Sequence, residues 1–103
     1  MIYHITPKNY WEGQKNRSHY APLEFEREGF IHCSKADQLK GVLQRYYSGQ
    51  TDLLILEIDE SKLDVKLLYE VGGTGELFPH VYGGISMNSI LKVTPLSNFS
   101  LPQ

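Results

Sequence analysis

Two short segments of the chain alternate side chains in the manner of β-strands, and each carries one histidine among apolar neighbours. They are Ile2–Thr6 (Ile-Tyr-His-Ile-Thr) and Glu28–Ser34 (Glu-Gly-Phe-Ile-His-Cys-Ser). Successive side chains of a strand point to opposite faces, so one face of each segment holds its histidine. These faces carry Ile2, His4 and Thr6 in the first segment and Phe30, His32 and Ser34 in the second. If the two strands lie side by side, both histidines can face one cleft.

Four further segments have strand patterns. Leu53–Ile58 is apolar on both faces until Glu57, which predicts a central strand. In the segment 65–70, apolar and polar positions alternate more regularly than in 53–58, and the residues expected to point inward are Val65, Leu67 and Tyr69. Short strands are also expected at 78–84 and 90–94, and the glycines of 72–75 indicate a flexible hairpin loop before the first of these.

Two helices are predicted from their start and stop signals. Thr6 followed by Pro7 is typical of a hydroxyl N-cap before a short helix. Ser34 is expected to cap a second helix that ends near Gly49. Its apolar residues recur at helical spacing and should face the core: Leu39, Val42, Leu43 and Tyr46. Residues 17–27 give no clear pattern, and one helical turn is expected at 86–89.

About six short strands and two helices that do not alternate strictly indicate an α+β fold with a strongly bent, mainly antiparallel sheet. A length of 103 residues predicts one domain, which we assign to 1–95, with a C-terminal tail at 96–103 where the pattern is lost. The formal net charge of −2 gives no general attraction to nucleic acid or to an anionic membrane. Cys33 is the single cysteine, which excludes an internal disulfide. With no apolar run of membrane-span length and no signal-peptide pattern, the expected location is cytoplasmic.

Histidine is the residue type that points to chemistry here, because three of the four histidines lie in predicted strands. These are His4, His32 and His80. Imidazole can donate from one nitrogen and accept on the other near neutral pH, whether in a site or as a satisfied structural group. Three imidazoles can also hold zinc, although no local pair such as His-x-His is present. Cys33 points away from its neighbour His32 on a strand, so a core thiol is the better interpretation than a nucleophile.

Three motifs in order resemble a small bacterial family catalogued as domain of unknown function 952. They are Ile2–Thr6, Glu28–Ser34 and Phe78–Gly83 (Phe-Pro-His-Val-Tyr-Gly), and the resemblance covers residues 1 to about 95. That family is regarded as having the ADP-ribosyltransferase fold. The resemblance therefore implies two packed, strongly curved, mainly antiparallel sheets with two short flanking helices and a cleft that holds NAD.

The resemblance also implies roles for residues in that cleft. His4 would orient a ribose of NAD, and His32 would contact the transferred or phosphate-bearing end. His80 stands where the wider superfamily commonly has a glutamate that stabilises the cation-like ribose, and Glu70 or Glu76 could take that place. The expected catalytic residues are His4, His32 and His80, and the expected cofactor-binding residues are His4, Thr6, Ser34 and Tyr82.

Three functions follow for testing. The first is binding of NAD or a related small-molecule nucleotide, with possible transfer of ADP-ribose or phosphate to an RNA or protein acceptor. The second is a non-enzymatic nucleotide-binding or regulatory module that has the fold without the catalysis. The third is a metal-dependent hydrolase with histidine ligands. The sequence leaves the acceptor and the oligomeric state open.

Overall fold

Residues 1–102 are described by the computed structural model, which has a mixed α+β architecture with antiparallel sheets and short helices. Its strands are β1 (Ile2–Pro7), β2 (His19–Tyr20), β3 (Ile31–His32), β4 (Leu53–Ile58), β5 (Lys66–Val71), β6 (Leu77–Tyr82), β7 (Ile85–Ser86) and β8 (Ile90–Pro95). The α-helices are α1 (Lys8–Glu12), α2 (Phe25–Glu28) and α3 (Leu39–Tyr46). Short 3₁₀ turns are η1 (Ala36–Gln38), η2 (Glu60–Lys62), η3 (Met87–Ser89) and η4 (Leu96–Asn98). The α+β class predicted from the sequence is confirmed.

The first sheet has the order β1–β4–β8 and is antiparallel throughout. The central place predicted for residues 53–58 is confirmed. Alternate residues of β4 enter two apolar clusters: Leu54, Leu56 and Ile58 join the larger one, and Leu53 and Ile55 the smaller. A strand buried on both faces needs apolar residues at every position, and each fully buried aliphatic side chain contributes about 1.5–3 kcal/mol.

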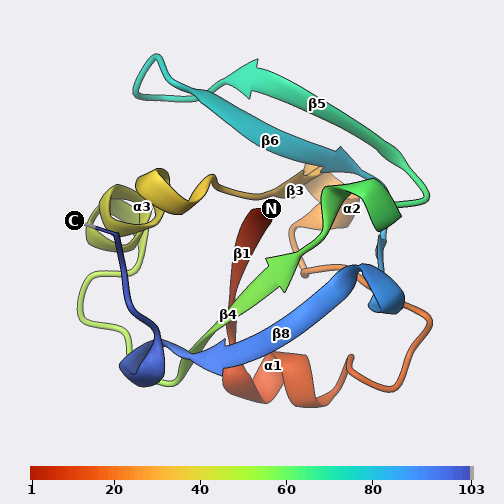
Figure 1. Cartoon of the computed structure of the whole chain (residues 1–103), viewed down its shortest axis with the longest axis horizontal. Helices are drawn as coiled ribbons and strands as arrows, with labels where there is room; N and C mark the ends of the chain where they lie inside the picture. Colours follow the sequence, from red (N-terminus) through yellow and green to blue (C-terminus); the bar gives the residue numbers. More distant parts are fainter. Residues whose placement is uncertain (103) are drawn as a thin grey trace.

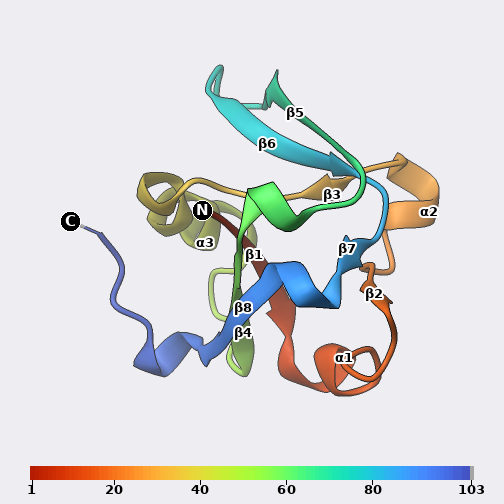
Figure 2. The ribbon, with the colours of Figure 1, turned by 45° about the vertical axis from the view of Figure 1, so that its right-hand side comes forward.

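The second three-stranded sheet has the order β3–β6–β5, and the β5–β6 hairpin crosses above the first sheet (Figure 1). The hairpin loop expected at 72–75 is present, with Gly75 at a φ of 86°. In both ribbon views the hairpin turn extends toward α3 (Figures 1 and 2). The Gln38 side chain just before α3 donates to the carbonyl of Leu77 at 2.8 Å and so ties the two together.

A backbone bridge joins the two three-stranded sheets. Tyr3 of β1 and Ser34, just after β3, exchange two backbone hydrogen bonds of 2.8 Å each. The expectation that the two histidine segments lie side by side is confirmed at this bridge. A smaller sheet, β2–β7, completes the framework.

Both predicted helix caps are wrong. Thr6 lies within β1, Pro7 precedes α1, and the Thr6 hydroxyl bonds to Tyr20 instead of capping the helix. Ser34 is occupied by its bridge to Tyr3, so the next helical segment begins with η1 after Lys35.

The apolar stripe of α3 is confirmed at its start only. Leu39 is buried, and Val42 and Leu43 pack against the smaller cluster. Tyr46 is 63% exposed, and Tyr47 packs in its place after the helix has ended. In β5, Tyr69 is exposed as well, so its expected inward orientation is wrong.

Residues 17–27 contain β2 and most of α2, and they bring the fully buried Tyr20 into the core. In the segment assigned as a tail, Phe99 packs edge-on against Tyr3 with ring centroids 6.0 Å apart, and Leu101 reaches the same cluster. This segment is therefore held against the domain through Leu101; Gln103 lies outside the described residues.

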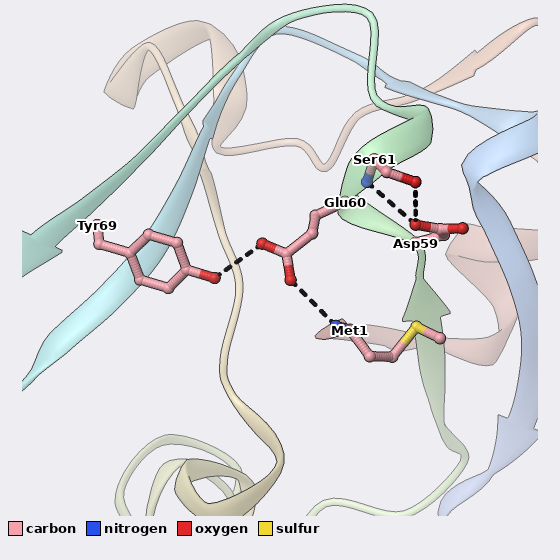
Figure 3. Close-up of polar contacts among 5 residues, drawn as sticks. All are labelled: Met1, Asp59, Glu60, Ser61 and Tyr69. Atoms are coloured by element: carbon pink, nitrogen blue, oxygen red, sulfur yellow. Dashed lines mark hydrogen bonds and ion pairs between the residues drawn. The ribbon is translucent and has the colours of Figure 1, made fainter.

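Glu60 connects the start of β1 to the second sheet. Figure 3 shows its carboxylate between the Met1 amino group and the Tyr69 hydroxyl, at 3.0 Å from each. Next to it, Asp59 accepts hydrogen bonds from the Ser61 hydroxyl and backbone, and these lower the pKa of Asp59.

Candidate functional site

A cleft of about 1190 Å³ is bounded by both three-stranded sheets. Its wall is formed by β1, the region of α2, β3, the end of α3 and the hairpin turn at 71–74. The lining includes His4, His32, His80, Thr6 and Ser34, so five of the six predicted site residues meet at one hollow. The sixth, Tyr82, is not among the lining residues of the described chain.

His4 lies in the wall with both ring nitrogens already bonded. Its side chain is buried, Nδ1 lies 2.7 Å from the His32 carbonyl oxygen, and Nε2 lies 2.9 Å from the Tyr20 hydroxyl. A carbonyl only accepts, so Nδ1 carries the proton and donates. Burial lowers the pKa of His4 to about 4, so the ring is neutral near pH 7 and Nε2 is an acceptor.

A chain of polar contacts continues from His4 into the core. Because Nε2 accepts, the single hydroxyl proton of Tyr20 goes to His4, and the Thr6 hydroxyl, 2.9 Å away, then donates to Tyr20. Burial raises the pKa of Tyr20. His4 and Thr6 therefore tie β1 to β2 and β3, and a ligand that engaged either polar group would have to replace one of these bonds.

His32 and His80 form a second arrangement on the face of the β3–β6–β5 sheet opposite to Ile31 and Val81, which enter the larger apolar cluster. They are direct partners across the β3–β6 ladder, and their ring centroids lie 5.4 Å apart in an edge-to-face orientation. Phe30 stacks on His80 at a centroid distance of 4.2 Å and an interplanar angle of 26°. The three rings form one aromatic and imidazole surface at the cleft.

Each imidazole of this pair has a carboxylate partner. His32 Nε2 lies 2.8 Å from Glu28 Oε2, and His80 Nδ1 lies 2.8 Å from Glu70 Oε1. The hydrogen bond with His32 lowers the pKa of Glu28, so this carboxylate is ionised near neutral pH. Nδ1 of His32 and Nε2 of His80 make no hydrogen bond within residues 1–102 and can meet a ligand.

Tyr82 has a different position from the one predicted. Its hydroxyl donates to Glu70 at 2.6 Å, and that bond, followed by the one from His80, lowers the pKa of Glu70. The same bond raises the pKa of Tyr82. Tyr82 therefore orients the carboxylate behind His80, and its ring lies 5.4 Å from Phe30.

Ser34 and Cys33 are buried at the cleft wall. Burial raises the pKa of the Cys33 thiol, so it stays protonated near neutral pH. This agrees with a core thiol and not with a nucleophile.

Sequence reasoning did not assign roles to Glu28 or Phe30, and it offered Glu70 only as a substitute for the missing glutamate, not as the partner of His80. Glu28 stands four residues before His32, and the intervening turn at Gly29, with a φ of 83°, brings the two side chains together. Glu70 could have been found from the hairpin register, because a turn at 72–75 places residue 70 opposite 78 and diagonal to His80.

The metal-ligand arrangement considered for the three histidines is not present among the described residues. Residues 1–102 contain no group of three His, Cys, Asp or Glu side chains that could hold a metal ion. His4 turns both nitrogens to protein groups, so the three histidines do not converge as ligands.

The fold and the cleft define a small α+β domain in which two antiparallel sheets flank a histidine-lined hollow. The chain belongs to the family described as protein of unknown function (DUF952), whose model matches residues 5–93. No curated protein matches the chain. Among the described residues, no helix is long and apolar enough to cross a membrane.

Solved structures of protein CC0527 from Caulobacter crescentus are similar to this chain. One crystal structure has a TM-score of 0.83 at 25% identity and covers 99% of this chain and 92% of the other. A crystal structure of a double mutant has the same TM-score and the same coverage at 24% identity, and it supports the fold alone. A solution structure has a TM-score of 0.79 at 25% identity, with 92% and 83% covered.

Proposed function

We propose that this domain binds NAD or a related nucleotide in the cleft, as an ADP-ribosyltransferase-like protein of the cytoplasm. The observation that carries the proposal is the composition of one hollow, which joins aromatic rings, free imidazole nitrogens and one arginine. Ligand pockets are mostly apolar with a few placed polar groups, at about 300–1,000 Å³, and a cleft of about 1190 Å³ has room for a dinucleotide. The single cysteine supports the reducing compartment.

Arg45 is the side chain suited to a phosphate. It lines the cleft at the end of α3 and makes no ion pair within residues 1–102. Its guanidinium lies against Gly41, where an added Cβ would be 2.9 Å from Nη1, and 5.7 Å from the Tyr46 ring centre. A planar guanidinium placed in this way can bind a phosphate through two parallel hydrogen bonds.

Aromatic side chains supply surfaces for a base or a nicotinamide ring. Phe30 and Phe78 line the cleft beside His80, and Tyr47 lines it from the end of α3. Stacking on aromatic rings contributes about 1–3 kcal/mol per base. The nucleotide in our proposal extends from these rings to Arg45.

Cleavage of the nicotinamide–ribose bond needs a carboxylate near the developing positive charge. We assign this role to Glu28, because Glu28 lines the cleft and bonds His32 through one oxygen only, whereas Glu70 is not among the lining residues and is engaged by His80 and Tyr82. Both ring nitrogens of His4 are bonded to protein groups, so His4 could orient a ribose only by giving up its bond to His32 or to Tyr20. This favours the alternative, a binding module without catalysis.

Calorimetric titration with NAD, ADP-ribose and nicotinamide mononucleotide tests the proposal. Arg45→Gln should weaken binding about 10–100-fold, the worth of a charge-assisted hydrogen bond. Arg17→Gln, which removes an exposed arginine outside the cleft, should change nothing. Absence of heat with all three ligands would overturn the proposal, and release of nicotinamide that Glu28→Gln abolishes would decide for the enzyme over the binding module.

A further inference from the structure

His32 and His80 are the best-prepared pair of titratable groups in the molecule. Each ring has one nitrogen fixed by a carboxylate and the other without a partner among the described residues. A carboxylate behind an imidazole holds one tautomer and one ring orientation and stabilises the imidazolium. Two imidazoles prepared in this way can transfer protons in opposite directions in one reaction.

The spacing of the rings suits a phosphoryl group. Proton transfer needs a nitrogen about 2.6–3.2 Å from the oxygen on each side of the reacting atom. The ring centroids lie 5.4 Å apart, edge to face, so the two rings are close enough to serve one small substrate, and the inference requires each free nitrogen to reach an oxygen of the same phosphate. Phe30 holds the His80 ring in place by stacking.

The charges about the pair limit the size of the substrate. Glu28 and Glu70 each carry a negative charge beside the histidines, and Glu24 also lines the cleft, against the single positive charge of Arg45. Arg27 and Lys66 are the other cations that act on these carboxylates. These three carboxylates and three cations leave the region close to neutral. Such a region does not favour a polyanion such as a long RNA, but it accepts a nucleotide with one charged phosphodiester.

From these observations we propose that His32 and His80 act as a general acid–base pair that hydrolyses a nucleoside 2′,3′-cyclic phosphate. The inference rests on the proposed function in that a nucleotide occupies the cleft. A five-membered cyclic phosphodiester is strained and small, and its hydrolysis needs only water besides the two proton-transfer groups.

The reaction balances as follows. The oxygen of a water molecule attacks phosphorus while one proton of that water passes to the free nitrogen of the neutral imidazole. The bond from phosphorus to O2′ or O3′ breaks, and the leaving oxygen takes its proton from the other ring, which is protonated at the start. The product is a nucleoside monophosphate, and proton exchange with solvent restores both rings.

The test uses the full chain with adenosine 2′,3′-cyclic phosphate, and product formation is followed by chromatography or ³¹P NMR between pH 4.5 and 8.5. We expect a bell-shaped profile, and a rate loss of about 100-fold or more for His32→Ala and for His80→Ala, the usual contribution of a general acid or base. His19→Ala is the matched control, because His19 also bonds a carboxylate at 2.8 Å, Asp64, but lies outside the cleft. It should keep the wild-type rate.

Glu28→Gln and Glu70→Gln give a readout that mere structural damage would not reproduce. Each change removes the charged partner that fixes the adjacent ring, so the limb of the rate profile that belongs to that ring should move. The variant behind the base moves the acidic limb, and the variant behind the acid moves the basic limb. Near-UV circular dichroism and thermal melting confirm that each variant is folded.

A rate no higher than in buffer, a flat profile, or full activity in folded His32→Ala or His80→Ala would overturn the inference. Parallel titration with NAD separates it from the proposed function. NAD binding without hydrolysis would refute the acid–base pair alone, whereas hydrolysis without NAD binding would refute NAD as the ligand and leave the pair standing.

Discussion

Replacing Tyr20 with phenylalanine tests the assignment of His4 and Thr6 to a structural network. The change removes one oxygen from a fully buried ring and leaves its apolar packing against Trp11 in place. His4 Nε2 loses its donor and Thr6 loses its partner, both in the buried wall of the cleft. A buried polar group left without a partner costs about 1–3 kcal/mol, so the free energy of unfolding should fall by about 2–4 kcal/mol.

Urea unfolding followed by circular dichroism measures this loss. For a domain of this size the expected loss corresponds to a fall in Tm of about 10–20 °C. Tyr69→Phe is the control, because the Tyr69 hydroxyl bonds Glu60 at an exposed position where water can replace it. A loss for Tyr20→Phe within about 0.5 kcal/mol, the range of surface substitutions, would show that the network carries no stability and refute our interpretation of His4.

Three more outcomes are expected. Because the pKa of His4 falls from 6.5 to about 4 on folding, the unfolded chain binds more protons between these pH values. The free energy of unfolding should therefore drop by about 3 kcal/mol as pH falls from 7 to 4. His4→Gln should remove most of this pH dependence. Gly83 has a φ of 154°, and an added Cβ would lie 2.6 Å from Val65 Cγ1, so Gly83→Ala should lower the free energy of unfolding in urea by more than about 2 kcal/mol. Gly49 has a φ of 80° with open space around it, so Gly49→Ala should cost only the backbone strain of about 1–2 kcal/mol. Equal losses for the two variants would contradict the clash with Val65. Cys33 should react with a disulfide reagent at pH 7.5 only when urea unfolds the chain, and rapid native labelling would contradict its burial.

The strands could be predicted wherever one face or both faces were buried. Residues 53–58 show this best, since a strand between two others and between two apolar clusters leaves no position for a polar side chain before Glu57. The helix starts could not be predicted in the same way. Thr6 and Ser34 have the residue types of caps, but the Thr6 hydroxyl bonds to Tyr20, and the Ser34 backbone pairs with Tyr3 while the helical segment begins one residue later, after Lys35.

The meeting of the histidines at one cleft was predicted, but their hydrogen-bond partners were not. Alternation along a strand tells which face a side chain takes, and so it grouped His4 with His32. It does not tell whether a ring nitrogen finds a protein partner, and that depends on Tyr20, which lies in a stretch without any strand or helix pattern. The pairings of Glu28 with His32 and of Glu70 with His80 were missed for the same reason, because turn geometry and strand register define them.

The hydrogen bond between the Gln38 side chain and the carbonyl of Leu77 makes the width of the cleft entrance depend on one side chain. The Gln38 side chain fixes the distance between the β5–β6 hairpin and α3, and both of these elements line the cleft. A shorter or longer residue at that position would change the distance between Leu77 and α3, and with it the width of the entrance between the hairpin turn and the helix. Residue 38 is therefore a position at which relatives with this fold can differ in the size of ligand that the cleft admits.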